Sequence, residues 1–203
     1  SYLSNAIALT HENGALYIMD EMITGFKTDF PGSIKKYGVS PDLATWGKGI
    51  ANGFAFSALT GKKEVMELGG IRNLGEEKVF LTSTTHGAET SGMAACLATI
   101  NEFEKYDVIS HNHSIGKMVH TKSREIVNSL NLEEFVQVSS CDWWPKFTFR
   151  DLDMQISLDF KTLAMQEMIS NGVLFTGTFV PCFSHKDEDV VFFLEALNKS
   201  LKV

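Results

Sequence analysis

Residues 15–26 read ALYIMDEMITGF, a short apolar run that ends in two acids and a Thr-Gly-Phe turn. A short, uninterrupted apolar run is typical of a strand that is buried on both faces in a parallel sheet. In α/β sheets, ligands bind outside the carboxyl ends of the strands. Asp20, which follows the run directly, is therefore a candidate for a site at that edge of the sheet.

Two further segments place polar residues where predicted strands end. Residues 41–49 read PDLATWGKG, and residues 82–90 read TSTTHGAET. Gly47 and Gly49 flank Lys48, and glycines let the backbone approach a ligand closely. We expect Asp20, Lys48 and Thr85 to lie at the same edge of one sheet.

Each segment, taken alone, also has a purely structural explanation. An acid at a strand end can be a helix cap, a lysine between glycines can be a solvated loop residue, and a Thr-rich turn can cap a helix. Two nucleotide sites fit less well. A phosphate-binding P-loop needs Ser or Thr after Gly-Lys, where this chain has Gly49, and no GxGxxG follows the first predicted strand.

The predicted elements divide the chain into an α/β part and a smaller α+β part. A boundary near residues 105–112 gives domains 1–107 and 108–203. A final helix is expected after the capping-box pattern Ser184-x-x-Asp187. The other predicted helices are 2–13, 62–68, 88–106, 108–130 and 156–171, and the predicted strands are 15–19, 43–46, 54–59, 79–82, 136–138, 146–150 and 173–175.

Composition and charge argue against several classes of protein. The net charge of -7 opposes binding to nucleic acid or to an anionic membrane surface. We see no apolar run long enough for a membrane span and no signal peptide, and three scattered cysteines suit reduced thiols in a cytoplasm. His111, His113 and His120 do not share one helix face, so we expect no metal site.

The first two segments together resemble the signature of class III aminotransferases that depend on pyridoxal 5'-phosphate (PLP). The motif Asp-Glu-x-x-Thr-Gly-Phe, followed by Pro-Asp-Leu-x-Thr-x-Gly-Lys, carries this resemblance. It implies an α/β fold of the PLP-dependent transferase fold type I, with part of the large cofactor domain followed by the C-terminal small domain. Residues 172–175 (GVLF) and 184–190 (SHKDEDV) look like the end of the glutamate-1-semialdehyde 2,1-aminomutase branch.

The resemblance also implies a role for each candidate site residue. Lys48 would hold PLP as a Schiff base and move the proton between substrate and cofactor, and Asp20 would keep the pyridine nitrogen protonated. Met22 would lie against one ring face and Ile23 near the ring hydroxyl, although core packing explains both equally well. Thr85 would reach the PLP phosphate of the neighbouring subunit, which implies a homodimer.

The third segment departs from the family pattern. His86, Ala88, Glu89 and Thr90 stand where the family has an aromatic residue, Gly, Asn and Pro. The family's upstream phosphate turn and stacking aromatic are absent, so we expect a piece of a longer enzyme. The expected substrate is a small amino or oxo acid, and a glutamate-1-semialdehyde-like compound is the leading candidate. The alternatives are another amine substrate, or an idle remnant that serves only in binding or dimerisation.

Overall fold

The computed structural model describes residues 1–70, 75, 77, 87 and 89–203. The predicted strand 79–82 and the candidate residue Thr85 lie outside these residues. The described backbone forms two compact units, Ser1–Ile109 and Ser110–Val203. That these units are a cofactor domain and a small domain stays a prediction.

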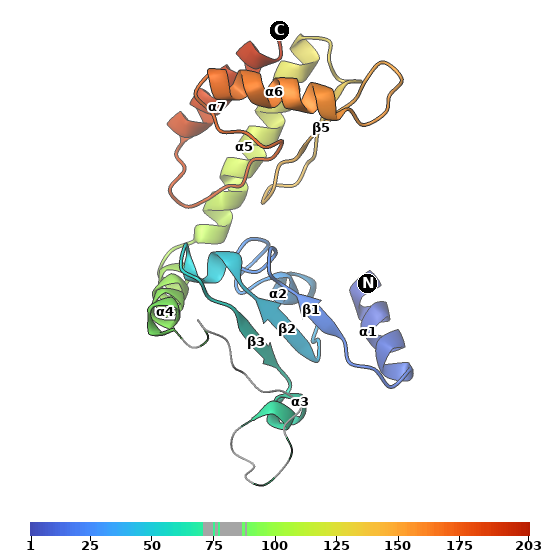
Figure 1. Cartoon of the computed structure of the whole chain (residues 1–203), viewed down its shortest axis with the longest axis vertical. Helices are drawn as coiled ribbons and strands as arrows, with labels where there is room; N and C mark the ends of the chain where they lie inside the picture. Colours follow the sequence, from blue (N-terminus) through green and yellow to red (C-terminus); the bar gives the residue numbers. More distant parts are fainter. Residues whose placement is uncertain (71–74, 76, 78–86, 88) are drawn as a thin grey trace. The chain divides into compact units, whose positions relative to one another are not determined.

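A three-stranded sheet forms the centre of the first unit (Figure 1). Its strands are β1 (Ile18–Asp20), β2 (Leu43–Trp46) and β3 (Ala58–Gly61), in that order. β1 pairs with β2 in parallel, with Asp20 opposite Thr45, and β3 pairs with β2 antiparallel, with Ala58 opposite Trp46. The sheet is therefore mixed, and the predicted strand 43–46 is confirmed to the residue.

The helices of the first unit and the sheet enclose a small aromatic core. Phe26, Ala44, Trp46 and Ile50 are its buried members, and Phe26 makes edge contacts with the rings of Phe30 and Phe103. The helices are α1 (Tyr2–Glu12), α2 (Ser33–Tyr37), the 3-10 turn η1 (Lys48–Ala51), α3 (Lys63–Met66), the 3-10 turn η2 (Glu67–Gly69) and α4 (Thr90–Lys105).

Two expectations for this unit were wrong. The strand expected at 54–59 begins only at Ala58, and residues 55–56 pack against α4 at Gly92 instead. A Cβ atom at Gly92 of α4 would come within 2.7 Å of the Ala55 carbonyl oxygen. The strand expected at 15–19 is shorter and later, at Ile18–Asp20, and residues 33–37, for which no element was expected, form α2. Its Ile34 N–H donates to the Glu21 carboxylate at 2.7 Å, a contact between distant residues that no local pattern reveals.

The second unit packs three helices and a two-stranded sheet around one core. The helices are α5 (Val108–Ser129), α6 (Leu158–Ser170) and α7 (Asp187–Ser200), and the antiparallel strands are β4 (Val136–Val138) and β5 (Phe147–Phe149). Phe147, Phe175, Phe179 and Phe193 form a cluster of contacting rings at the centre. None of the helices in the described ranges is long and apolar enough to cross a membrane.

Two expectations failed here as well. Residues 173–175 were expected as a strand but are irregular: Phe175 lies in the core at 1% exposed, whereas Leu174 is 87% exposed. The final helix begins at Asp187, and its N-cap is Lys186, two residues after the expected cap Ser184. The Asp189 carboxylate accepts a hydrogen bond from the Lys186 N–H at 2.9 Å, so an acid inside the first turn caps this helix from within.

Candidate active site

Asp20 and Lys48 lie at the same edge of the sheet. Asp20 is the last residue of β1 and pairs in register with Thr45. Lys48 begins η1, two residues after β2 ends at Trp46. Because β1 and β2 are parallel neighbours, their carboxyl ends deliver both residues to one edge, where ligands bind in α/β sheets.

The Asp20 carboxylate is held through one of its two oxygens. Oδ1 accepts hydrogen bonds from the Met22 N–H at 2.9 Å and from the Thr45 hydroxyl at 3.2 Å. Within the part of the chain that the structure describes, Oδ2 has no such partner, and the side chain is exposed. The two donors fix the orientation of the carboxylate and leave one oxygen for a ligand.

Lys48 stands in a backbone conformation that lysine rarely adopts. Its φ of 51° lies in the left-handed region, directly after the extended Gly47. Ile50 and Ala51, both buried, anchor the turn, while Lys48 is exposed. Among the described residues, the Lys48 amine makes no hydrogen bond or ion pair. A left-handed non-glycine residue that packing holds in place is a common feature of functional sites.

Met22 is packed against the turn that carries Lys48. A Cβ atom at Gly47 would lie 2.4 Å from the Met22 Cε and 2.8 Å from its Sδ, so a larger residue here would displace the end of the Met22 side chain. Ile23 is 37% exposed and follows Met22 on the same loop. The structure thus gathers Asp20, Met22 and Lys48 around one edge, whereas Thr85 lies outside the described residues.

A second lysine near this edge was not singled out from the sequence. Burial lowers the pKa of Lys27, and the positive charge of Lys48 lowers it further. The two amines are therefore close enough to interact electrostatically. The only sequence signal was the position of Lys27, directly after the Thr-Gly-Phe turn.

The acid beside Asp20 has a structural role. Glu21 is fully buried, and its carboxylate accepts hydrogen bonds from the Thr24 hydroxyl and the Ile34 N–H. It also fills the space beside Gly32, where a Cβ atom would lie 2.8 Å from the carboxylate. Successive residues of an extended chain point to opposite faces. Asp20 therefore faces the site edge, and Glu21 holds the 21–34 loop.

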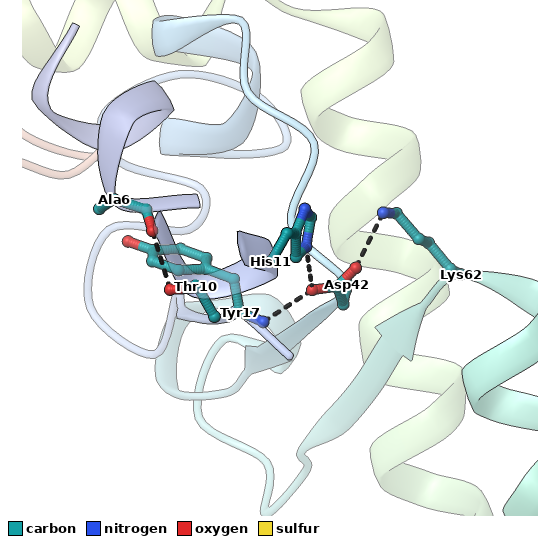
Figure 2. A network of polar contacts seen from close by, with 6 residues as sticks. All are labelled: Ala6, Thr10, His11, Tyr17, Asp42 and Lys62. Atoms are coloured by element: carbon teal, nitrogen blue, oxygen red, sulfur yellow. Dashed lines mark hydrogen bonds and ion pairs between the residues drawn. The ribbon is translucent and has the colours of Figure 1, made fainter. Parts of the chain in front are cut away.

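Asp42 anchors the opposite, amino-terminal end of β2 (Figure 2). Its carboxylate is 4% exposed and accepts hydrogen bonds from the His11 ring at 2.7 Å, the Tyr17 N–H at 2.7 Å and the Lys62 amine at 2.8 Å. The bond from Lys62, then those from Tyr17 and His11, hold the pKa of Asp42 well below its usual range. Asp42 thereby ties α1 and the ends of β1 and β3 to β2.

Comparisons with known proteins identify the fold and the family. A 3-aminobutyryl-CoA aminotransferase of Cloacimonas acidaminovorans is 29% identical over 98% of this chain and 47% of its own length. A glutamate-1-semialdehyde 2,1-aminomutase of Ignicoccus hospitalis is 31% identical over 100% of this chain and 48% of its own length. A solved transaminase with PLP bound has a TM-score of 0.81 at 16% identity, over 96% of this chain and 46% of that one.

The structural similarity confirms the expected fold, that of PLP-dependent transaminases. The chain spans about half the length of the curated relatives it matches. The family model "Aminotransferase class-III" matches residues 1–140, which is more than half of the chain. The chain therefore belongs to the class III aminotransferase family.

Proposed function

We propose that this chain carries the cofactor lysine and its partner acid of a PLP-dependent aminotransferase or aminomutase. One observation supports this most strongly. Parallel neighbouring strands bring Asp20 and Lys48 to one edge, where each side chain is exposed and has a polar atom without a partner among the described residues. The family to which the chain belongs depends on PLP.

The residues at this edge fit the chemical needs of that cofactor. When bound, PLP supplies an electron sink for the electrons released at the substrate carbon. Asp20 Oδ2 is available to accept the pyridinium N–H, and the donors to Oδ1 keep the carboxylate in place. The Lys48 amine is the covalent anchor and the group that carries the proton to and from the substrate carbon.

The remaining site residues extend this proposal. Met22, packed on Gly47, offers a polarisable apolar side chain to one face of the ring. Ile23, which cannot form a hydrogen bond, would lie near the ring hydroxyl. Thr85 would donate to the cofactor phosphate in the neighbouring subunit, and the working enzyme would then be a homodimer.

The names of the relatives bear on the substrate. One relative is a glutamate-1-semialdehyde 2,1-aminomutase and another is a 3-aminobutyryl-CoA aminotransferase, at 31% and 29% identity. We propose a small amino or oxo acid like glutamate-1-semialdehyde as the substrate. The second candidate is an amine such as the 3-aminobutyryl group, and it rests on the similarity to the Cloacimonas protein.

An assay of the assembled enzyme tests this proposal. The chain is co-expressed with the upstream half of a class III relative, supplied with PLP and given glutamate-1-semialdehyde or 3-aminobutyryl-CoA. We expect turnover of one of them, lost in Lys48→Ala and retained in the matched control Lys63→Ala, whose side chain is 83% exposed on α3. An assembly that binds PLP yet converts neither compound would favour a binding or dimerisation module.

A further inference from the structure

Cys182 and His185 form a pair of nucleophile and base in the second unit, just before α7. The Cys182 Sγ lies 3.4 Å from His185 Nδ1, within the reach of a hydrogen bond to sulfur. The Cys182 side chain is exposed, so a dissolved reagent can reach the thiol. A thiol within hydrogen-bond reach of a positioned base is the arrangement that activates cysteine nucleophiles.

The contacts of the His185 ring show which nitrogen is the acceptor. The Cys182 backbone N–H donates to Nδ1 at 3.1 Å, which places the proton of the neutral ring on Nε2. The single lone pair of Nδ1 therefore faces both donors of Cys182, its backbone N–H and its thiol. Burial lowers the pKa of His185, Asp189 raises it and His111 lowers it again, with burial the largest effect. The neutral, proton-accepting ring is thus favoured.

Neighbouring groups hold the imidazole in this position. His111 Nε2, on α5, donates to the His185 carbonyl oxygen at 3.0 Å. The ring centroid of Phe179 lies 5.0 Å from that of His185. His185, but not Cys182, lines a hollow of about 860 Å³, together with His111 and residues 183–184 and 186–188. A base that its surroundings orient beside an exposed thiol can take up the thiol proton.

The other two cysteines provide contrasting environments. Cys96 is half-buried and packs against the aromatic core of the first unit, and burial raises the pKa of its thiol. Cys141 is also half-buried. Buried thiols in apolar surroundings are inert, whereas accessible thiols beside a base react.

We propose that Cys182 is a site of covalent modification by small disulfides, with His185 as the proton acceptor. His185 Nδ1 takes the thiol proton, and the Cys182 sulfur attacks one sulfur of the disulfide. The S–S bond of the reagent breaks, a mixed disulfide forms at Cys182, and the departing thiolate takes up the proton. One disulfide and one thiol are consumed and one of each is formed, so no further oxidant is needed.

The test uses the full chain and the neutral aromatic disulfide dithiodipyridine at neutral pH, without PLP. Released thiopyridone gives the rate, and peptide mapping gives the site. We expect Cys182 to be modified first, about tenfold faster than N-acetylcysteine amide, because the imidazole takes the thiol proton as the sulfur attacks. Cys182→Ser should abolish this fast phase, whereas the matched control Cys141→Ser should leave it unchanged.

The base role is tested with His185→Gln, which can still accept the Cys182 N–H but cannot take the thiol proton. We expect the fast phase to slow roughly tenfold, with a smaller effect in His111→Gln, whose amide can still donate to the His185 carbonyl oxygen. Equal slowing in both variants would assign the effect to loosening of the turn and overturn the proposal. Circular dichroism shows whether His185→Gln folds. If it does not, the rate for the unaltered chain is compared with that of N-acetylcysteine amide. A Cys182 that is modified no faster than this free thiol would overturn the proposal.

Discussion

At the scale of single residues, Asp20 has one carboxylate oxygen held by the chain and one oxygen available to a ligand. Asp20→Asn keeps the shape but removes the charge that would hold the pyridine nitrogen protonated. We expect turnover of the assembled enzyme to fall by roughly 100-fold or more, about 3 kcal/mol of transition-state stabilisation. PLP affinity should weaken less than turnover.

Steady-state kinetics with a matched control measures this effect. Glu12→Gln removes one charge from the exposed end of α1, and its kinetics should match those of the unaltered enzyme. Near-normal turnover in Asp20→Asn would rule out the electron-sink role of this carboxylate.

Asp42 predicts how the first unit responds to acid. Its pKa is lowered chiefly by the hydrogen bond from Lys62, followed by those from Tyr17 and His11. A carboxyl whose pKa is lower in the folded chain stabilises it above the unfolded pKa of about 3.9. This stabilisation is lost as the pH falls through the folded pKa. Between neutral pH and about pH 4 it should therefore be nearly constant, and it should decline below that.

Hydrogen exchange measures this locally. Asp42→Asn should raise the exchange of the amides of residues 17 and 43 at neutral pH, and below pH 4 the difference from the unaltered chain should shrink. Asp153→Asn, on an exposed loop of the second unit, is the matched control. It should leave the hydrogen exchange of the two amides unchanged at neutral pH and below pH 4. An acid dependence as steep in Asp42→Asn as in the unaltered chain would mean that other carboxyl groups control it.

At the scale of elements, the close contact between α5 and the 141–145 loop depends on Gly116. A Cβ atom there would lie 1.6 Å from the Asp142 carbonyl oxygen and 2.6 Å from its carbon. Gly→Ala inside a helix normally stabilises by about 1 kcal/mol. Here the obstacle is backbone, so we expect Gly116→Ala to destabilise the second unit by about 1–3 kcal/mol net.

Urea unfolding followed by circular dichroism measures this change. Ser114→Ala, at an exposed position of the same helix, is the control and should be neutral or slightly stabilising. A stability of Gly116→Ala equal to or above that of the unaltered chain would show that the loop moves away at little cost.

The same scale shows what the sequence could reveal. The apolar segment 43–46, the long helix from Val108 and the edge position of Asp20 and Lys48 follow from local periodicity and strand direction, and all three are confirmed. The five-residue helix α2 depends on the buried Glu21, and in the irregular segment 173–175 Phe175 lies in the core while Leu174 is exposed. Such tertiary contacts join distant residues, so no local pattern predicts them. The proximity of Lys27 to Lys48 was missed for the same reason.

At the scale of the whole molecule, the chain leaves apolar surface and a strand edge exposed. In the described ranges β1 pairs with β2 alone, and Leu16 and Ile18 beside that edge are 52% and 57% exposed. Exposed strand edges and apolar patches promote association. We expect the isolated chain to dimerise, to aggregate or to need the complementary half that its relatives have, and to be poorly active alone.

Light scattering combined with an activity assay tests this expectation, on the chain alone and after co-expression with an upstream half. Activity should appear with the added half and should follow the dimer. A stable, fully active monomer of 203 residues would contradict the proposal that Thr85 serves the cofactor of a neighbouring subunit.

The central claim is that Lys48 is the residue that binds PLP covalently. The most direct measurement is borohydride reduction of the PLP-loaded assembly, which fixes the cofactor on its lysine as a stable secondary amine, followed by peptide mapping. We expect the label on Lys48, its loss in Lys48→Arg, and its retention in Lys27→Arg. Label on Lys27, Lys62 or Lys63 in place of Lys48 would contradict the proposed site.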